Sequence, residues 1–463
     1  MGRRERRSHV FAETLDHAGG EASSYFTRVA FCFVMSTIET QSLTEIRRDL
    51  HSYPEAGWKE FRTTALVAEE LDRLGYELHL GGDALDTSSQ LGVPDDDELS
   101  RALSRAKDEG APGRYVDATD GVTGLVAETT FGDGSGPTVG LRVDMDALEL
   151  TEAGDADHRP ASEGFASRHP EEMHACGHDG HTAIGIGVAR ALREDTAFDG
   201  VVKLFFQPAE EGGRGGYPMS RTAHLADVDY FMALHLGLDN DVGTVIAGYD
   251  RPLSNAKFDV EFSGDPSHAG KEPNDGRNAL QAAATAIQNL YAIPRHGDGP
   301  TRINVGQVHS PNAQNVIAEH AQLRVEVRGG TADLNEYMRD AADRVIEHAA
   351  GMHDVSVDTA LYGQTTSFEA DQALVDVVSA ATRSVDGVET VRDRDQIGAS
   401  EDASYLIRRV QEEGGAATYI GIGASNVSGH HTSRFDFDES ALNIGVEVVT
   451  GTIDRLAGVD AER

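Results

Sequence analysis

Cysteine and long apolar runs are scarce in this sequence of 463 residues. The two cysteines are Cys32 and Cys176, so an intramolecular disulfide framework cannot form in the body of the chain. This fits a cytoplasmic protein, because disulfides are rare in that compartment. No stretch approaches the roughly 18 consecutive apolar residues that a membrane span needs. We therefore expect no association with a membrane.

Basic residues are also few. The chain has 40 Lys and Arg against 78 Asp and Glu, a formal net charge of −38, and the acids are spread along its length. Nucleic acid is excluded as a partner, because binding phosphates requires clustered Lys and Arg. Such a surface indicates a halophilic protein. In molar salt the Debye length is about 3 Å, so the repulsion between the acidic side chains is screened. The lysines are Lys59, Lys107, Lys203, Lys257 and Lys271.

The first residues have a composition of their own. They begin with closely spaced arginines and contain a short apolar patch at residues 29–34. That patch is too short, and too far from the arginines, for a signal peptide. We predict that residues 1–34 are a disordered or non-native leader and that Met35 is the true start.

Local signals mark the first helices. Ser42 and Glu45 form the pattern of a capping box, which predicts a helix through residue 50. Apolar residues at helical spacing predict a second helix over residues 61–74, which Gly75 would terminate. The polar segment 81–120 is expected to be an insertion or a helical excursion rather than sheet.

The length predicts two domains. Residues 35–251 and 366–463 alternate helical patterns with short buried strands, as in an α/β domain with a parallel or mixed sheet. The apolar runs 201–206 and 230–234 are typical strands of this kind. Ligands of such sheets bind beyond the carboxyl ends of the strands. The polar residues expected at such ends are Asp144, Glu210, Glu211 and His235.

Residues 252–365 show a different pattern of apolar and polar residues. Phe258, Val260 and Phe262 alternate with acidic residues, and residues 323–328 repeat the alternation. Strict alternation predicts antiparallel strands with one face in water. Two helical patterns, 276–290 and 333–348, interleave with about four strands. We expect a small α+β module inserted into the first domain.

Residues 173–181 read Met-His-Ala-Cys-Gly-His-Asp-Gly-His and precede an apolar helical run. Thiolate and imidazole ligands packed so densely indicate a metal site at the start of a helix. The alternative is a polar loop with surface histidines. Cys176 is the only cysteine after residue 34. We therefore expect it to be a metal ligand or a nucleophile rather than a core residue.

The apolar run 201–206 leads into Gln-Pro-Ala-Glu-Glu-Gly-Gly. Adjacent glutamates at a strand end can point in different directions, one toward a metal and one toward a water molecule that it deprotonates. The alternative is two surface acids. The glycine-rich residues 212–216, which include Arg214, lack the Gly-Lys-Ser/Thr ending of a phosphate loop, and this excludes that function.

Together these motifs resemble the aminoacylase/carboxypeptidase-type dinuclear metallohydrolases, in their amidohydrolase branch. The resemblance runs from about residue 40 to the C-terminus. It implies a metallopeptidase-like α/β catalytic domain with a central mixed sheet, and a ferredoxin-like lid and dimerisation domain at residues 252–365. The motifs that carry it are, in order, residues 51–55, 141–148, 173–181, 206–212, 267–270 with 278–280, and 430–439.

The resemblance also implies two divalent metal ions, Zn²⁺ or Mn²⁺. Thiolate and imidazole suit zinc, and a carboxylate-rich site also accepts manganese. His430 and His431 compete for one ligand position. His431 stands four residues before Phe435, as in the family pattern, although Ser433 replaces its usual proline. The implied ligands are Cys176, His178, Glu211, His235 and His431.

Further roles follow from the same resemblance. Glu210 is the implied general base, and His268 resembles a histidine that stabilises the oxyanion in the active site of a partner subunit. Asn315 and Arg328 resemble substrate-binding positions, although Arg328 fits a surface salt bridge as well. Three further groups either orient the ligands through hydrogen bonds or are solvated polar residues, namely Asp146, His181 and Asp144.

The implied activity is hydrolysis of the amide bond of N-acyl or N-aroyl amino acids, with aminobenzoyl-glutamate as the first substrate to test. A dipeptidase or an N-acetyl-amino-acid deacetylase of the same family is the alternative. A non-catalytic metal-binding subunit is a third hypothesis. The expected partners are a small-molecule substrate and a second subunit, in a homodimer or in a heterodimer with a paralogue.

Overall fold

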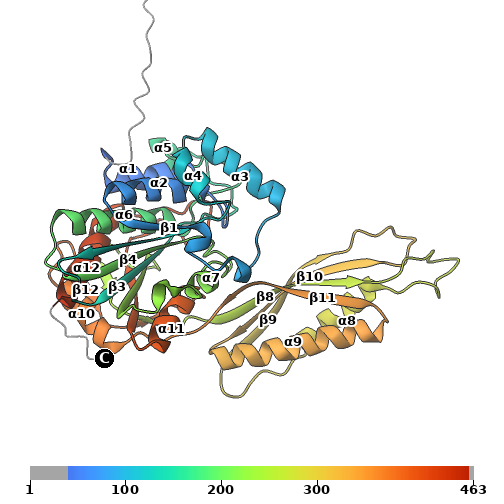
Figure 1. The fold of residues 1–463 in the computed structure, drawn as a ribbon. Helices are drawn as coiled ribbons and strands as arrows, with labels where there is room; N and C mark the ends of the chain where they lie inside the picture. Colours follow the sequence, from blue (N-terminus) through green and yellow to red (C-terminus); the bar gives the residue numbers. More distant parts are fainter. Residues whose placement is uncertain (1–39, 458–463) are drawn as a thin grey trace, which may run out of the picture. The chain divides into compact units, whose positions relative to one another are not determined.

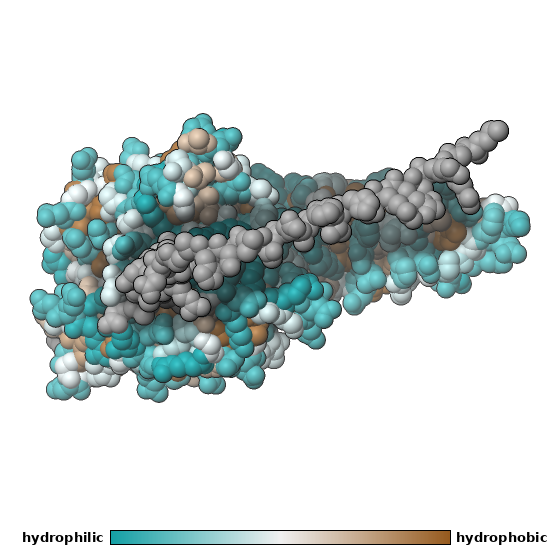
Figure 2. Space-filling model, turned by 90° about the horizontal axis from the view of Figure 1, so that it is seen from above, coloured by the Kyte–Doolittle hydropathy of each residue, from teal (hydrophilic) through white to brown (hydrophobic). Residues whose placement is uncertain are grey.

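The computed structural model describes residues 40–457. The predicted leader, residues 1–34, lies outside this range. Among the helices of the described residues, none is long and apolar enough to cross a membrane. The face drawn in Figure 2 is dominated by hydrophilic side chains, in keeping with the acidic composition.

The larger sheet has eight strands in the order β1-β2-β4-β3-β5-β14-β6-β12. At its centre β4, β3, β5 and β14 run parallel to one another, while β1, β2 and β6 pair with antiparallel neighbours. The predicted mixed α/β architecture is confirmed. The strands are β1 (Glu77–Leu80), β2 (Leu125–Phe131), β3 (Thr138–Asp144), β4 (Gly200–Gln207), β5 (Tyr230–Leu236), β6 (Thr244–Ile246), β12 (Thr390–Arg392) and β14 (Ala416–Ile422), with β7 (Tyr249–Asp250) and β13 (Asp395–Gln396) paired separately.

Helices cover both faces of this sheet (Figure 1). Alternate strand residues point to opposite faces, so Phe206 packs in the larger hydrophobic cluster and Phe205 in the smaller one. The larger cluster receives side chains from α1 (Leu43–Ser52), α2 (Phe61–Arg73), α6 (His178–Glu194), α10 (Gln372–Thr382) and α12 (Ser440–Leu456). The smaller cluster receives them from α7 (Gly216–Ser220) and α11 (Ser404–Glu412).

Helix boundaries follow local signals in the sequence. The predicted capping box at the start of α1 is present, with the side chains of Ser42 and Glu45 each bonded to the other's backbone N–H. α2 ends just before Gly75, which takes a positive φ of 79°. The polar segment 81–120 is helical rather than sheet, with α3 (Asp96–Asp108) and α4 (Gly113–Ala118).

A second, four-stranded sheet has the order β11-β8-β10-β9 and is antiparallel throughout. The alternation of apolar residues therefore gave the correct strand type. One face of this sheet packs on two helices and forms its own hydrophobic cluster. The elements are β8 (Ser254–Ser263), α8 (Ala279–Tyr291), β9 (Thr301–His309), β10 (His320–Gly329), α9 (Ala332–Met352) and β11 (Ser356–Thr365). The division into a catalytic domain and a lid domain, 252–365, remains a prediction.

The order of the strands in the larger sheet cannot be predicted from local sequence patterns. β2 and β3 follow one another in the chain, but they are not neighbours in the sheet, because β4 lies between them. This insertion gives β3 parallel neighbours on both sides. The carboxyl ends of β3, β4 and β5 therefore lie along one edge of the sheet.

Candidate metal centre

Polar side chains converge beyond the carboxyl ends of the parallel strands. Asp144 ends β3, Glu210 and Glu211 follow β4, and His235 lies near the end of β5. The predicted ligands fall into two overlapping groups, and in each group the ligand atoms lie within 4.8 Å of one another. The first group is Cys176, His178 and His235, and the second is Cys176, Glu211 and His431.

A glycine shapes the turn between the first two ligands. Gly177 has a φ of 92° and caps α6, which starts at His178. This left-handed conformation is readily available only to glycine. The chain therefore turns sharply between Cys176 and His178, and both side chains are buried. The geometry matches a metal-binding motif at the start of a helix.

Hydrogen bonds fix which histidine nitrogen faces the cluster. His178 donates Nδ1–H to the carbonyl oxygen of Asp146 at 2.9 Å, and His235 donates Nδ1–H to the carbonyl of Leu236 at 2.7 Å. In its neutral form each ring then presents the lone pair of Nε2, as a metal ligand must. The Nε2 of His178 is buried and has no hydrogen-bond partner, and that of His235 lies 3.5 Å from Cys176 Sγ. Buried acceptors of this kind fit a divalent cation.

The electrostatics of the thiol favour the same conclusion. Burial, together with the negative charge of Glu211, raises the pKa of Cys176 well above its usual value. Burial and the neighbouring His181 and His430 lower the pKa of His235, so that ring is neutral and able to ligate. A divalent ion would supply the positive charge that a buried thiolate needs. The donor set of thiolate, imidazole and carboxylate fits zinc or manganese.

His430 and His431 occupy different environments. His431 Nε2 lies 3.1 Å from Glu211 Oε1, and its backbone takes a positive φ of 60°. The ring of His430 instead lies edge-on to His235, with centroids 5.4 Å apart, and burial lowers its pKa to about 4. This geometry favours His431 as the ligand, although His430 stands next to the same cluster.

Asp146 connects the ligands to the predicted base. Its Oδ1 accepts the backbone N–H of Glu210 at 3.0 Å, and its Oδ2 accepts that of Glu211 at 2.9 Å. Oδ1 also lies 3.2 Å from Nδ1 of His178. The side chain is buried and contacts three predicted site residues, so it is not a solvated surface acid.

His181 and Asp144 form a second buried pair. Nδ1 of His181 donates to Asp144 Oδ1 at 2.5 Å, and its Nε2 accepts the backbone N–H of Leu236 at 2.9 Å. Because both ring nitrogens are engaged, His181 supports the end of β5. Asp144 also pairs with Arg142 at 2.7 Å and lies 3.8 Å from Nε2 of His178.

The surroundings of Glu210 disfavour its charged form. Burial raises its pKa well above that of an ordinary carboxyl, and the negative charges of Glu401, Asp402 and Glu211 raise it further. A carboxylate that readily takes up a proton suits general acid–base catalysis. The residue before it, Ala209, has a positive φ of 51°.

Sequence reasoning gave no role to Glu401 and Asp402. Asp402 accepts the backbone N–H groups of Gly215 and Gly216, so it holds the loop that carries Glu210. Glu401 accepts the hydroxyl of the buried Tyr419 at 2.5 Å. The sequence of residues 400–403 is one of the features that carry the family resemblance, but the resemblance assigned no role to its two acids.

Lys257 was also missed. Its Nζ, on β8, donates to the carbonyl of Gly212 at 3.0 Å, next to the Glu210–Glu211 pair. Burial lowers the pKa of Lys257, while Glu326 and the two glutamates act in the opposite direction. The scarcity of lysine in the sequence was the only hint.

The remaining predicted residues do not reach the cluster. His268 and Asn315 are exposed and lie on adjoining segments, where Ala269 N–H donates to the carbonyl of Asn315 at 3.0 Å. Arg328, on β10, pairs with Glu326 at 3.0 Å. Within residues 40–457, the structure records no contact between these side chains and the predicted metal ligands.

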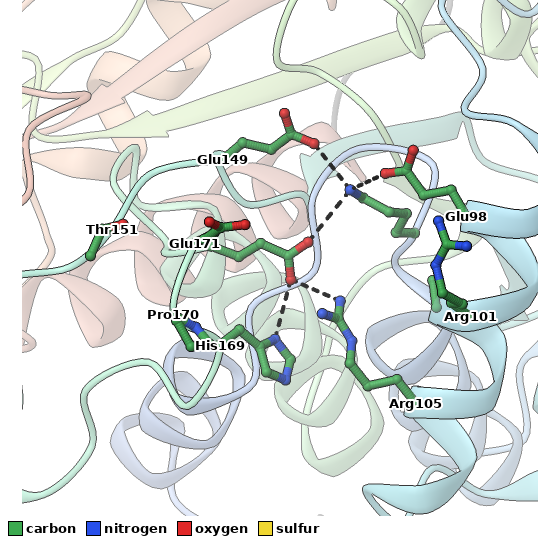
Figure 3. A pocket seen from close by; sticks show the side chains of 11 residues that line it. Glu98, Arg101, Arg105, Glu149, Thr151, His169, Pro170 and Glu171 are labelled. Carbon is green, nitrogen blue, oxygen red and sulfur yellow. Dashed lines mark hydrogen bonds and ion pairs between the residues drawn. The ribbon is translucent and has the colours of Figure 1, made fainter.

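A cavity of about 540 Å³ lies beside the site and is lined by Glu211 and Arg214 among others. A second cavity, of about 980 Å³, is shown in Figure 3 and shares the lining residues Lys59, Glu98 and Glu149 with the first. Helix α3, from the segment 81–120, lines part of the second cavity.

Comparison with known proteins identifies the family. The family model for peptidase family M20/M25/M40 matches residues 140–455. The chain is 46% identical over 413 residues to indole-3-acetyl-aspartic acid hydrolase of Enterobacter agglomerans, covering 89% of this chain and 94% of that protein. It is 45% identical, with the same coverage of 89% and 94%, to one subunit of p-aminobenzoyl-glutamate hydrolase of Escherichia coli strain K12.

A solved structure agrees with these matches. The aminobenzoyl-glutamate utilization protein of Klebsiella pneumoniae superposes with a TM-score of 0.78 at 40% identity, covering 89% of this chain and 95% of that one. The family resemblance that the ordered motifs suggested is therefore confirmed. This chain belongs to peptidase family M20/M25/M40 and is an amidohydrolase of that family.

Proposed function

We propose that this enzyme hydrolyses the amide bond between an acyl or aroyl group and an amino acid, with p-aminobenzoyl-glutamate as its first candidate substrate. One observation carries the proposal: Asp146 binds the backbone of both Glu210 and Glu211 and lies beside His178, so the candidate base and the ligands share one support. The names of the relatives at 45% and 46% identity support the same class of substrate.

The five predicted ligands would hold two ions, Zn²⁺ or Mn²⁺. Such ions, when bound, polarise the scissile carbonyl and lower the pKa of water. Glu210 takes the proton of the attacking water and delivers it to the amide nitrogen, which leaves as the amine. Its position next to the ligand Glu211 suits this transfer, because the Asp146 carboxylate fixes the backbone of both residues.

The inserted module supplies the remaining groups. Lys257 on β8 joins the module to the Glu210 loop through the carbonyl of Gly212. His268 and Asn315 act in the site of a second subunit, where His268 donates a hydrogen bond to the oxyanion. Arg328 holds the α-carboxylate of the substrate with its bidentate fork. The second subunit is another copy of this chain or a paralogue.

Mixing two variants tests this arrangement. Glu210→Gln and His268→Ala are each expected to be inactive as purified. If His268 acts in trans, a mixed dimer has one site that lacks both groups and one intact site, so mixing restores part of the activity. Variants that stay inactive after subunit exchange, verified by native mass spectrometry, would contradict the role in trans.

A substrate panel tests the function itself. Aroyl-glutamates, N-acetyl amino acids and dipeptides should be assayed in high salt with added Mn²⁺ or Zn²⁺, with the protein alone and with any paralogous partner. We expect turnover of aroyl-glutamates. Preferential turnover of dipeptides or N-acetyl amino acids would establish the alternative substrate class. Absence of turnover on every amide would leave the non-catalytic subunit as the surviving hypothesis.

A further inference from the structure

The cavity of about 540 Å³ beside Glu211 is lined by three cationic side chains, those of Lys59, Arg214 and Arg324. They differ in whether a carboxylate of the protein pairs with the positive charge. An anionic ligand group would be drawn to the cation whose charge no carboxylate already satisfies. The pairing of each side chain is therefore informative about the ligand.

Two of the three cations are neutralised. Lys59 Nζ lies 2.8 Å from Glu98 and 3.1 Å from Glu149, and Figure 3 shows both labelled glutamates pointing toward the same amine. Arg324 makes a bidentate pair with Asp259, at 2.7 and 2.9 Å. Each of these two cations therefore already has a carboxylate partner within the protein.

Arg214 differs from both. Its Nε donates to the carbonyl of Glu211 at 2.9 Å and its Nη1 to the carbonyl of Gly92 at 3.2 Å. The guanidinium also lies over the ring of Tyr362, 5.7 Å from the centroid. Within the described residues no carboxylate is paired with it, although the chain is strongly acidic. These contacts orient the side chain without neutralising it.

Donors remain available on this guanidinium. An arginine has five N–H donors, and the bonds to the carbonyls of Glu211 and Gly92 leave Nη2 unused. Nη2 lies against Gly57, where an added Cβ would come within 2.2 Å of it. A Cβ on Gly92 would come within 2.9 Å of Arg214 Cδ. Glycines at these two positions leave room for the guanidinium beside a predicted metal ligand.

We propose that Arg214 forms a subsite for the side-chain carboxylate of an acidic amino acid, and so makes the enzyme selective for conjugates of glutamate and aspartate. This rests on the proposed function, in which Glu211 binds a metal at the scissile amide. A carboxylate accepts two parallel hydrogen bonds from a guanidinium fork, which a neutral amide does not match. The segment 212–216, which is not a phosphate loop, would then recognise a different anion.

The test compares N-(4-aminobenzoyl)-glutamate with N-(4-aminobenzoyl)-glutamine, which share the aroyl group and the α-carboxylate and differ only at the end of the side chain. For the wild type we expect kcat/KM to be about 100-fold higher for the glutamate conjugate, as is typical when a charge pair is lost. In Arg214→Gln the ratio of the two kcat/KM values should fall to near one. Only the value for the glutamate conjugate should decrease. Arg324→Gln, in the same cavity, should keep the wild-type ratio.

The outcomes separate the two proposals. If the wild type hydrolyses both conjugates equally well, or if Arg214→Gln slows both by the same factor, the subsite is wrong while the proposed function stands. If the wild type hydrolyses neither these nor any other amide, the proposed function itself fails.

A second variant covers the case in which Arg214→Gln does not fold. Arg214→Lys keeps the charge but not the fork, so its ratio should fall to an intermediate value. An unchanged ratio in a folded Arg214→Lys would contradict the subsite. Metal content and thermal midpoint of each variant should match those of the wild type.

Discussion

Asp146 Oδ1 accepts the backbone N–H of Glu210 at 3.0 Å. The other oxygen of the same carboxylate accepts the N–H of Glu211, and His178 lies beside it. One side chain thus positions the candidate base and two candidate ligands at once. Groups that support ligands in this way affect metal affinity without touching the metal.

Asp146→Asn should therefore weaken metal binding. An amide side chain has one acceptor oxygen, so one of the two N–H groups is left unsatisfied in a buried place. We expect metal affinity to fall by about 10- to 100-fold, measured by competition with a chelator. Asp386→Asn, at an exposed position, is the matched control and should bind as the wild type does. Unchanged affinity in Asp146→Asn would show that the contact is dispensable.

Glu210→Gln should separate chemistry from metal binding. Glutamine keeps the size of the side chain but cannot take the proton, so kcat should fall by at least about 100-fold. The number of metal ions per chain, measured by inductively coupled plasma mass spectrometry, should stay the same. Glu447→Gln, an exposed position on α12, should retain full activity. Full activity of Glu210→Gln with metals bound would refute the mechanism.

Replacing Gly177 should destabilise the protein through its backbone. At a φ of 92° an alanine is strained, even though an added Cβ meets no atom closer than 3.6 Å. We expect a loss of about 1–2 kcal/mol in the free energy of unfolding, read from urea titrations. Gly113→Ala is the control, because no atom lies within 4 Å of its Cβ and its φ is not positive. Equal effects at the two positions would argue against strain at Gly177.

His169 should make stability depend on pH. Burial acts against its charged form, but Glu109 at 2.7 Å and Glu172 at 3.3 Å raise its pKa to about 9. Because the folded pKa lies above the unfolded value of about 6.5, the stabilisation is fully present below about pH 6.5 and is lost as pH rises through about 9. His169→Gln should therefore be less stable than the wild type in mild acid and close to it in alkali.

Urea unfolding at several pH values measures this difference. The gap between wild type and His169→Gln is expected to be on the order of 3 kcal/mol at the acidic end, from the size of the shift. His348→Gln, at an exposed position on α9, serves as the matched control. A gap that stays constant across the range would contradict the assignment of His169 as the titrating group.

Salt should stabilise the whole protein. A net charge of −38 repels itself at low ionic strength, and the Debye length shortens from about 10 Å at about 0.1 M salt to about 3 Å at about 1 M. The thermal midpoint should therefore rise with KCl concentration. Sucrose at matched osmolality serves as a control that does not screen charge. A midpoint that does not respond to KCl would rule out the halophilic interpretation.

Local sequence determined the ligand-bearing motifs and most of the secondary structure. Residues only a few positions apart determine three of these features. They are the Cys-Gly-His turn, the capping box before α1 and the alternating apolar residues of β8. Backbone and side-chain preferences act over that range, so these features can be recognised in the sequence alone. The place of Glu210 and Glu211 after a buried strand followed in the same way.

Tertiary structure alone decided how these motifs meet. The insertion of β4 between β2 and β3 sets the edge at which the parallel strands end, and strand order has no local signature. Asp402 holds the Glu210 loop, and Asp146 ties His178 to that loop, through contacts between residues far apart in the chain. The same holds for Arg214, because only the packed structure shows that, of the three cations lining this cavity, Lys59 and Arg324 are paired with carboxylates and Arg214 is not.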